Sequence, residues 1–114
     1  MAKLIITFSM RWFWLKSIYK STKDIIMNIC MIGKIESGLD TLRARVTHNM
    51  EVKGGNKFVS EWHLADLGDN KFSWFGNITD MEAMGAMMSD PEEVAWDEEN
   101  GAVYKVYSMA EMTD

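Results

Sequence analysis

The order of apolar and polar positions along residues 25–114 predicts four strands and two helices. Residues 25–35 (IIMNICMIGKI) are rich in β-branched side chains and nearly uncharged, which is typical of a strand buried on both faces. In residues 39–52, apolar side chains recur at spacings of three and four, which favours a helix with one apolar stripe formed by Leu39, Leu42, Val46 and Met50. Polar and apolar residues also alternate over 43–47, so a strand is the less favoured alternative there.

Two further segments predict a β-hairpin. Residues 57–66 and 71–79 flank the sequence LGDN, which has turn chemistry. If Asp66 pairs with Lys71, His63 lies opposite Trp74, and one face of the hairpin carries Val59, Glu61, His63, Phe72, Trp74 and Ile78. The other face then carries Phe58, Ser60, Trp62, Leu64, Ser73 and Phe75. A β-bulge would reverse half of this assignment.

The second helix is predicted in two pieces. Thr79 or Asp80 can cap the first piece, whose apolar stripe is Met81, Met84 and Met88. Asp90 and Pro91 restart the helix, and Gly101 ends it before a final strand over 102–109. The resulting order, βαββαβ, predicts a ferredoxin-like α+β fold with a four-stranded antiparallel sheet and both helices on one face.

Charge divides the chain into two regions. Residues 1–24 are aromatic and carry a net charge of +4, whereas residues 25–114 carry −9, and the 114-residue chain carries −5. We therefore treat 1–24 as an N-terminal extension and 25–114 as the ferredoxin-like domain. The favoured interpretation of the extension is a strand and a short helix docked on the domain or on a partner chain. A membrane-surface segment and a disordered or non-native extension are the alternatives.

The net negative charge argues against a nucleic-acid partner. No stretch approaches 18 uncharged apolar residues, so no transmembrane helix is expected. No cleavage site for a signal peptide follows the short apolar run at the start of the chain. Together with the lone thiol of Cys30, these features predict a cytoplasmic protein.

The predicted sheet has apolar side chains on both faces, although two helices can cover only one. Burying one large apolar side chain contributes about 1.5–3 kcal/mol, whereas a domain is stable by only about 5–15 kcal/mol. We therefore expect the second face to meet a second copy of the chain in a two-fold homodimer. The alternative is that residues 1–24 fold back over that face.

Residues 72–107 (FSWFGNITDMEAMGAMMSDPEEVAWDEENGAVYKVY) resemble the second half of dimeric α/β-barrel proteins. The shared pattern is an aromatic strand, a Met/Ala-rich helix, a Ser-Asp-Pro break, a Trp-containing helical end and a final strand. The resemblance is weaker over 25–71 and does not extend to 1–24. The superfamily includes cofactor-independent monooxygenases of the antibiotic-biosynthesis type, haem-degrading enzymes and muconolactone isomerases. It implies a ligand site in a cleft between the sheet and the helices of each protomer.

Haem-degrading members of that superfamily use an asparagine, a tryptophan and a histidine. The resemblance places Asn28 and Trp96 at the first two, but no histidine follows Trp96. The iron ligand is thus missing, and we expect no haem or other cofactor. No metal site is expected either, because His48 and His63 lie on separate elements and no clustered ligand spacing is present.

The methionines of the second helix, which adapt to varied apolar shapes, indicate either ordinary core packing or a deformable pocket. The predicted ligand-binding residues of such a pocket are Asn28, Trp74, Met84, Met88, Trp96 and Tyr104. The ligand would be an apolar, fatty-acid- or polyketide-like small molecule. The acidic run that follows is interpreted as a solvated face, consisting of Asp90, Glu92, Glu93, Asp97, Glu98 and Glu99.

The candidate catalytic residues are Glu61 and His63, which lie two residues apart on one predicted strand. A carboxylate beside an imidazole can orient it as a proton carrier, and a pair at the solvent edge is the alternative interpretation. Three functions therefore remain, in order of preference: a homodimer that binds an apolar small molecule, a cofactor-independent monooxygenase acting on an electron-rich aromatic or polyketide substrate, and a non-catalytic structural or interaction module.

Overall fold

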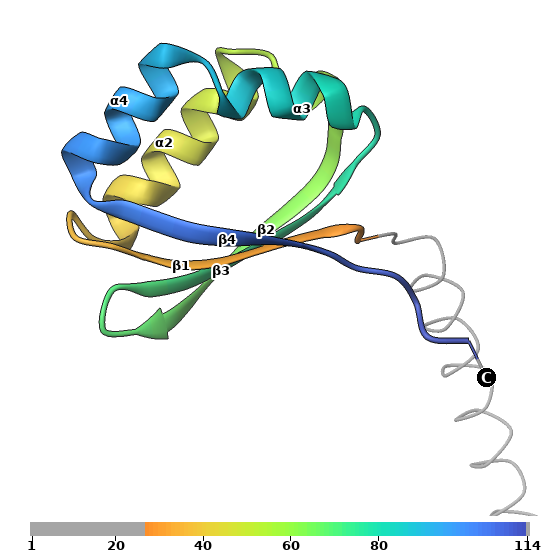
Figure 1. The fold of residues 1–114 in the computed structure, drawn as a ribbon, viewed down its shortest axis with the longest axis horizontal. Helices are drawn as coiled ribbons and strands as arrows, with labels where there is room; N and C mark the ends of the chain where they lie inside the picture. The colour runs from red at the N-terminus through yellow and green to blue at the C-terminus, as the bar shows by residue number, and fades with distance from the viewer. Residues whose placement is uncertain (1–26, 114) are drawn as a thin grey trace, which may run out of the picture.

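Four antiparallel strands form one open sheet in the order β2-β3-β1-β4, and the helices cover one of its faces (Figure 1). The computed structural model describes residues 27–113, so the predictions made for residues 1–24 lie outside the described part. The elements are β1 (Ile29–Ile35), α2 (Leu39–Glu51), a short 3₁₀ helix (Gly55–Lys57), β2 (Val59–Gly68), β3 (Lys71–Ile78), α3 (Met81–Met88), α4 (Pro91–Asn100) and β4 (Ala102–Ser108). The predicted α+β class and the four-stranded antiparallel sheet are confirmed. The second predicted helix is two helices, α3 and α4.

The boundaries of α3 and α4 follow local sequence signals. The Asp80 side chain accepts a hydrogen bond from the Ala83 N–H (3.0 Å), and the Asp90 side chain accepts one from the Glu92 N–H (2.9 Å). Pro91 occupies the first turn of α4, where its missing N–H costs nothing. Gly101 ends α4 in the left-handed conformation (φ 63°), which glycine adopts without steric cost.

The predicted pairing of the β2–β3 hairpin is wrong. Two irregularities, between Val59 and Glu61 and between Asp66 and Gly68, shift the register, so Asp66 pairs with Phe72 instead of Lys71. A shift of one residue moves every side chain between the two bulges to the opposite face. Trp62 and Leu64 consequently pack against the core beneath the helices, while Glu61 and His63 turn to the other face. Two residues with positive φ, Asp69 and Asn70, close the hairpin, as a type I′ turn requires.

The core lies between the helices and the sheet. Its buried apolar residues are Ile29, Met31, Ile35, Leu42, Met50, Val59, Phe72, Trp74, Ile78 and Met84. Gly33 of β1 pairs with Phe72 on one side and with Tyr104 on the other, whose ring centroids lie 6.4 Å apart. A Cβ at Gly33 would collide with the Val103 carbonyl oxygen and would lie 2.5 Å from the Tyr104 Cβ. The missing side chain at Gly33 therefore gives the two rings room to approach each other across the sheet.

We expect Gly33→Ala to lower the free energy of unfolding by about 2–3 kcal/mol, because the added methyl overpacks the junction of β1 and β4. Gly85→Ala is the matched control, since a Cβ there meets no atom within 4 Å. Gly85 lies inside α3, where alanine should add about 0.5–1 kcal/mol of stability. Urea unfolding of both variants measures the two effects, and wild-type stability of Gly33→Ala would contradict the packing argument.

Candidate functional site

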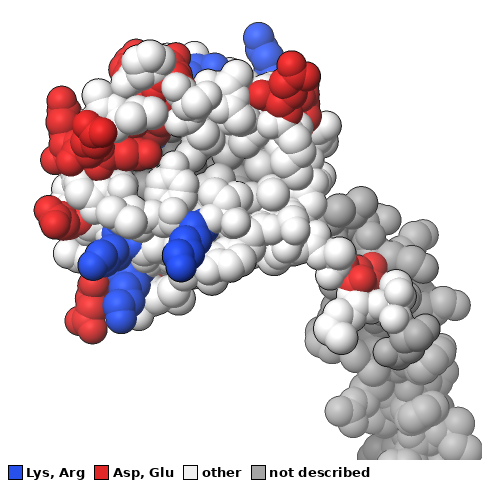
Figure 2. Space-filling view, in the orientation of Figure 1, with Lys and Arg blue, Asp and Glu red and all other residues white. Residues whose placement is uncertain are grey.

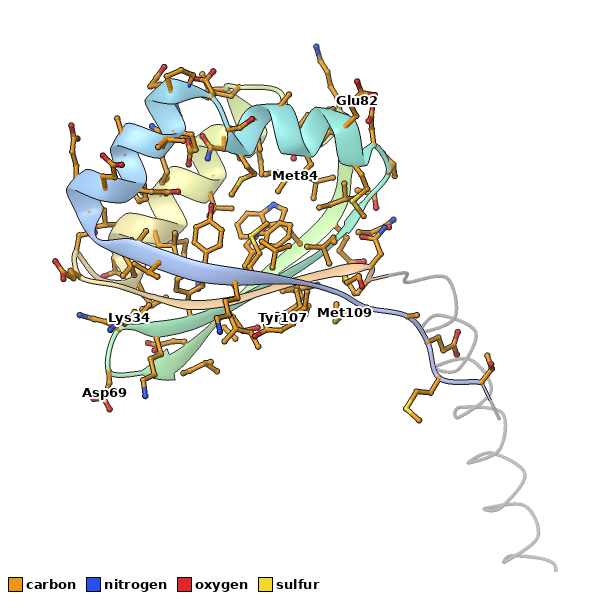
Figure 3. The ribbon with its side chains drawn as sticks, in the orientation of Figure 1. Lys34, Asp69, Glu82, Met84, Tyr107 and Met109 are labelled. Atoms are coloured by element: carbon orange, nitrogen blue, oxygen red, sulfur yellow. The ribbon has the colours of Figure 1, made fainter. Side chains whose placement is uncertain are left out.

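A cavity of about 60 Å³ lies between the sheet and the helices. Figure 3 shows Met84 reaching from α3 into the space above the sheet. The apolar part of the lining consists of Met31, Leu42, Val46, Met50, Phe72, Trp74, Met84, Met87, Met88, Trp96, Ala102 and Tyr104. The remaining lining residues are polar and come from two neighbouring helices: Arg45 and Asn49 of α2, and Glu93 and Asp97 of α4. The cavity therefore has an apolar body and one polar end.

Five of the six predicted ligand-binding residues line this cavity, namely Trp74, Met84, Met88, Trp96 and Tyr104. Asn28 does not. Its Nδ2 donates to the Ile78 carbonyl (2.7 Å), and its Oδ1 accepts from the Ile78 N–H (2.9 Å). Both polar ends of the Asn28 amide are thus used to tie the start of the described chain to the end of β3, which is a structural role.

The candidate catalytic pair lies on the face of the sheet away from the cavity. His63 Nε2 and Glu61 Oε1 are 3.0 Å apart, and the His63 side chain is 51% exposed. The imidazole stacks on Phe75, with ring centroids 5.4 Å apart, and Phe75 rather than Trp74 is its partner across the strands. The expected position of His63 opposite Trp74 is therefore wrong, and its catalytic role stays a prediction without support from the cavity.

A buried carboxylate organises the polar end of the cavity. Glu93 is only 4% exposed, although the sequence analysis assigned it to a solvated face. It accepts hydrogen bonds from Arg45 Nε (3.0 Å) and Nη2 (2.7 Å) and from Asn49 Nδ2 (3.0 Å). The Arg45 guanidinium also lies over the Trp96 ring, 5.4 Å from its centroid, which is a favourable cation–π geometry. The interpretation of Glu93 as a solvated residue is wrong, and these partners explain how the charge is tolerated.

Asn49 leaves one hydrogen-bonding atom unsatisfied. Its side chain is buried, and its Oδ1 has no hydrogen-bond partner within the described part of the chain. A carboxylate can only accept hydrogen bonds, so the amide nitrogen of Asn49 must face Glu93 and its oxygen must face elsewhere. An unsatisfied buried acceptor costs about 1–3 kcal/mol. A ligand or a bound water with a donor group would remove that cost.

Asp97 and Tyr104 form the second polar pair. The Tyr104 hydroxyl donates to Asp97 Oδ2 across 3.3 Å. Burial and the nearby Glu93 carboxylate raise the pKa of Asp97. Burial, together with Asp97, also raises the pKa of Tyr104, which keeps its hydroxyl protonated and able to donate. Asp97 is therefore a carboxyl group that takes up a proton more readily than an exposed aspartate does.

The sequence contained a signal for the polar residues that we missed. At 100° per residue, Trp96 and Asp97 flank Glu93 on one face of α4, and Trp96 was already a predicted pocket residue. Arg45 and Asn49 are likewise one turn apart on α2. The surrounding Glu92, Glu98 and Glu99 are exposed, and they made the whole acidic run look solvated.

Comparison with known proteins finds no matching family model, no similar curated protein and no similar solved structure. Within the described residues, no helix is long and apolar enough to cross a membrane. In the same part of the chain, no group of three or more His, Cys, Asp and Glu side chains is placed to hold a metal ion.

Asp97→Asn should raise the free energy of unfolding at pH 7. Because the pKa of Asp97 is higher in the folded protein than its ordinary value of 3.8, the folded state holds this proton more tightly than the unfolded chain does. The loss of stability caused by the charged Asp97 is absent below pH 3.8. It grows as the pH rises from 3.8 through the pKa of Asp97 in the folded protein. The gain in stability should therefore vanish in acid, as urea unfolding at several pH values would show.

Glu98→Gln on the exposed side of α4 is the matched control for the Asp97→Asn measurement, because it removes one negative charge from the same helix. It should not reproduce the pH-dependent gain. A loss of stability in Asp97→Asn that is larger at pH 7 than in acid would contradict the assignment of Asp97 as a destabilising buried charge.

Proposed function

We propose that this protein binds a small apolar molecule in the cavity between the sheet and the helices. The supporting observation is the lining, in which five methionines and four aromatic side chains surround a space with one buried polar end. Ligand pockets in proteins are typically apolar clefts with a few fixed polar groups that orient the ligand. The cavity and the unsatisfied Asn49 oxygen are the two features of this core that a bound ligand would explain.

The size of the cavity restricts the ligand. Its volume of about 60 Å³ is less than half of the roughly 150 Å³ that accommodates benzene in an engineered protein cavity. Entry of a ring therefore requires lining side chains to move. Met84, Met87 and Met88 of α3 are suited to this, because methionine has three rotatable bonds and adapts its shape. We accordingly favour a ligand of about one ring over a long acyl chain.

The Asp97–Tyr104 pair favours a second candidate function, the cofactor-independent oxygenation of an electron-rich aromatic compound. Such a reaction begins when a base removes a proton from the bound phenol or enol. A carboxylate with a raised pKa inside an apolar cavity can accept that proton. Oxygen uptake in the presence of quinol-type substrates would distinguish this activity from binding alone.

We further propose that the open face of the sheet joins two copies of the chain. This face carries the exposed side chains of Ile32, Val103 and Tyr107. The pairing of β1 with β4 places these three side chains on the same face of the sheet. Lysines lie near the hairpin end of the sheet, beside an acidic side chain and below the acidic surface around α4 (Figure 2). Glu61 lies toward the other end of the same sheet. A two-fold axis crossing the strands would bring the Glu61 end of one copy opposite the lysine end of its partner.

The binding proposal predicts selective perturbation of the cavity methionines. In ¹³C-methyl methionine spectra, toluene should shift the signals of Met31, Met50, Met84, Met87 and Met88, which line the cavity. The signals of Met81 and Met112, which are 49% and 94% exposed, should not move. Unchanged cavity signals at toluene saturation would overturn the proposed function, and native mass spectrometry of the purified protein would reveal a ligand that copurifies.

Filling the cavity should abolish this binding. Ala102→Leu places three additional carbons into the lining, and we expect it to weaken toluene binding at least about tenfold, or by about 1.4 kcal/mol. Ala86→Leu makes the same change at an exposed position of α3 and should leave the affinity unchanged. Equal affinities of the two variants would place the binding site elsewhere.

The dimer proposal predicts that light scattering during gel filtration reports twice the chain mass of 13.1 kDa. Ile32→Lys adds a positive charge to a face that already carries lysines, and we expect it to produce monomers. Val106→Lys places the same charge on the opposite face of the sheet, at a residue that is also exposed, and should remain dimeric. A monomeric wild-type chain would refute the interface.

A further inference from the structure

We infer that the ligand enters the cavity with a hydrogen-bond donor, a hydroxyl or a protonated amine, at its polar end, and that a carboxylate is excluded. This inference rests on the proposed function and deepens it by naming the ligand class. The observation behind it is the buried Oδ1 of Asn49, an acceptor without a partner in residues 27–113. A donor on the ligand would satisfy this atom, whereas a carboxylate, which only accepts, would not.

Several donors of the other polar groups in the cavity are already in use. Arg45 directs Nε and Nη2 at the same Glu93 oxygen, and the Asn49 amide nitrogen donates to the other Glu93 oxygen. The Tyr104 hydroxyl donates to Asp97. A ligand at this end therefore meets oxygen atoms that accept hydrogen bonds, while the donors aimed at Glu93 and Asp97 are already in use.

The charged residues of the cavity lining also argue against a ligand carboxylate. The described lining of the cavity contains two carboxyl groups, Glu93 and Asp97, and one cation, Arg45. Because Arg45 is committed to Glu93 at 2.7 Å, its charge is balanced before any ligand arrives. Lys53, the neighbouring cation on this side, is 3.1 Å from Glu92. A ligand carboxylate would be added to a site with an excess of negative charge, and a fatty acid is therefore a poor ligand for it.

Four probes that share one ring and differ in one substituent test this inference on the full-length protein. They are toluene, benzyl alcohol, benzylamine and benzoate, with affinities read from titrations of the cavity methionine methyl signals. We expect benzyl alcohol and benzylamine to bind about threefold to tenfold more tightly than toluene, the range that one net hydrogen bond provides. Benzoate should bind at least about tenfold more weakly than toluene.

The possible outcomes separate the inference from the proposed function. If toluene binds and the two donor probes bind no better, the cavity is a ligand site but the inference is wrong, and Asn49 is satisfied by water. Preferred binding of benzoate would also overturn the inference. If none of the four probes moves the cavity signals, the proposed function itself fails.

Two variants identify the atoms responsible. Asn49→Leu keeps the side-chain size but removes the acceptor, so the preference for benzyl alcohol over toluene should disappear. Because Asn49 also donates to Glu93, this variant could unfold, and Asp97→Asn provides an independent measurement in a variant that we expect to be more stable than the wild type. It removes one negative charge from the polar end, and the ratio of toluene to benzoate affinity should fall at least about threefold. An unchanged ratio would contradict the electrostatic part of the inference.

Discussion

The arrangement of the helices depends on the burial of one carboxylate. Glu93 is almost inaccessible to water, and an unpaired charge at such a position would cost several kcal/mol. Arg45 and Asn49, one turn apart on α2, supply the three hydrogen bonds that make its burial tolerable. Because these partners belong to a different helix, the requirement for pairing fixes α4 against α2. It also holds Arg45 over Trp96, so the polar end of the cavity is a consequence of this single constraint.

The floor of the cavity depends on a different constraint, the absence of side chains at particular points of the sheet. Gly33 lies between Phe72 and Tyr104 on neighbouring strands, and a Cβ there has no room. At Gly76, a Cβ would come within 2.8 Å of the Trp74 ring. Large aromatic side chains therefore lie over glycine positions and spread along the sheet instead of filling the space above it. The methionines of α3 close that space from the opposite side.

Much of the fold was predictable because its signals are local. The caps at Asp80 and Asp90 and the stop at Gly101 each act within one helical turn, and the structure confirms all three. The register of β2 was not predictable, because residues 58–64 contain apolar side chains in both phases of the alternation, and only tertiary packing selects Trp62 and Leu64 for the core. The same limit applies to Glu93. Its burial depends on Arg45, 48 residues away in the sequence, and no local pattern records that pairing.

The cavity and the open face of the sheet are physically separate surfaces. The described cavity lining comes from α2, α3, α4 and the inward side chains of β1, β3 and β4, whereas Ile32 and Tyr107 point away from it, because successive side chains of a strand alternate between faces. A partner copy on the open face would thus contribute no residue to the cavity and would not block it. The proposed ligand binding and the proposed self-association would therefore use separate surfaces of the same sheet. For the same reason, the His63–Glu61 pair lies on the open face of the sheet, and any effect of His63 on the cavity would have to pass through the strands themselves.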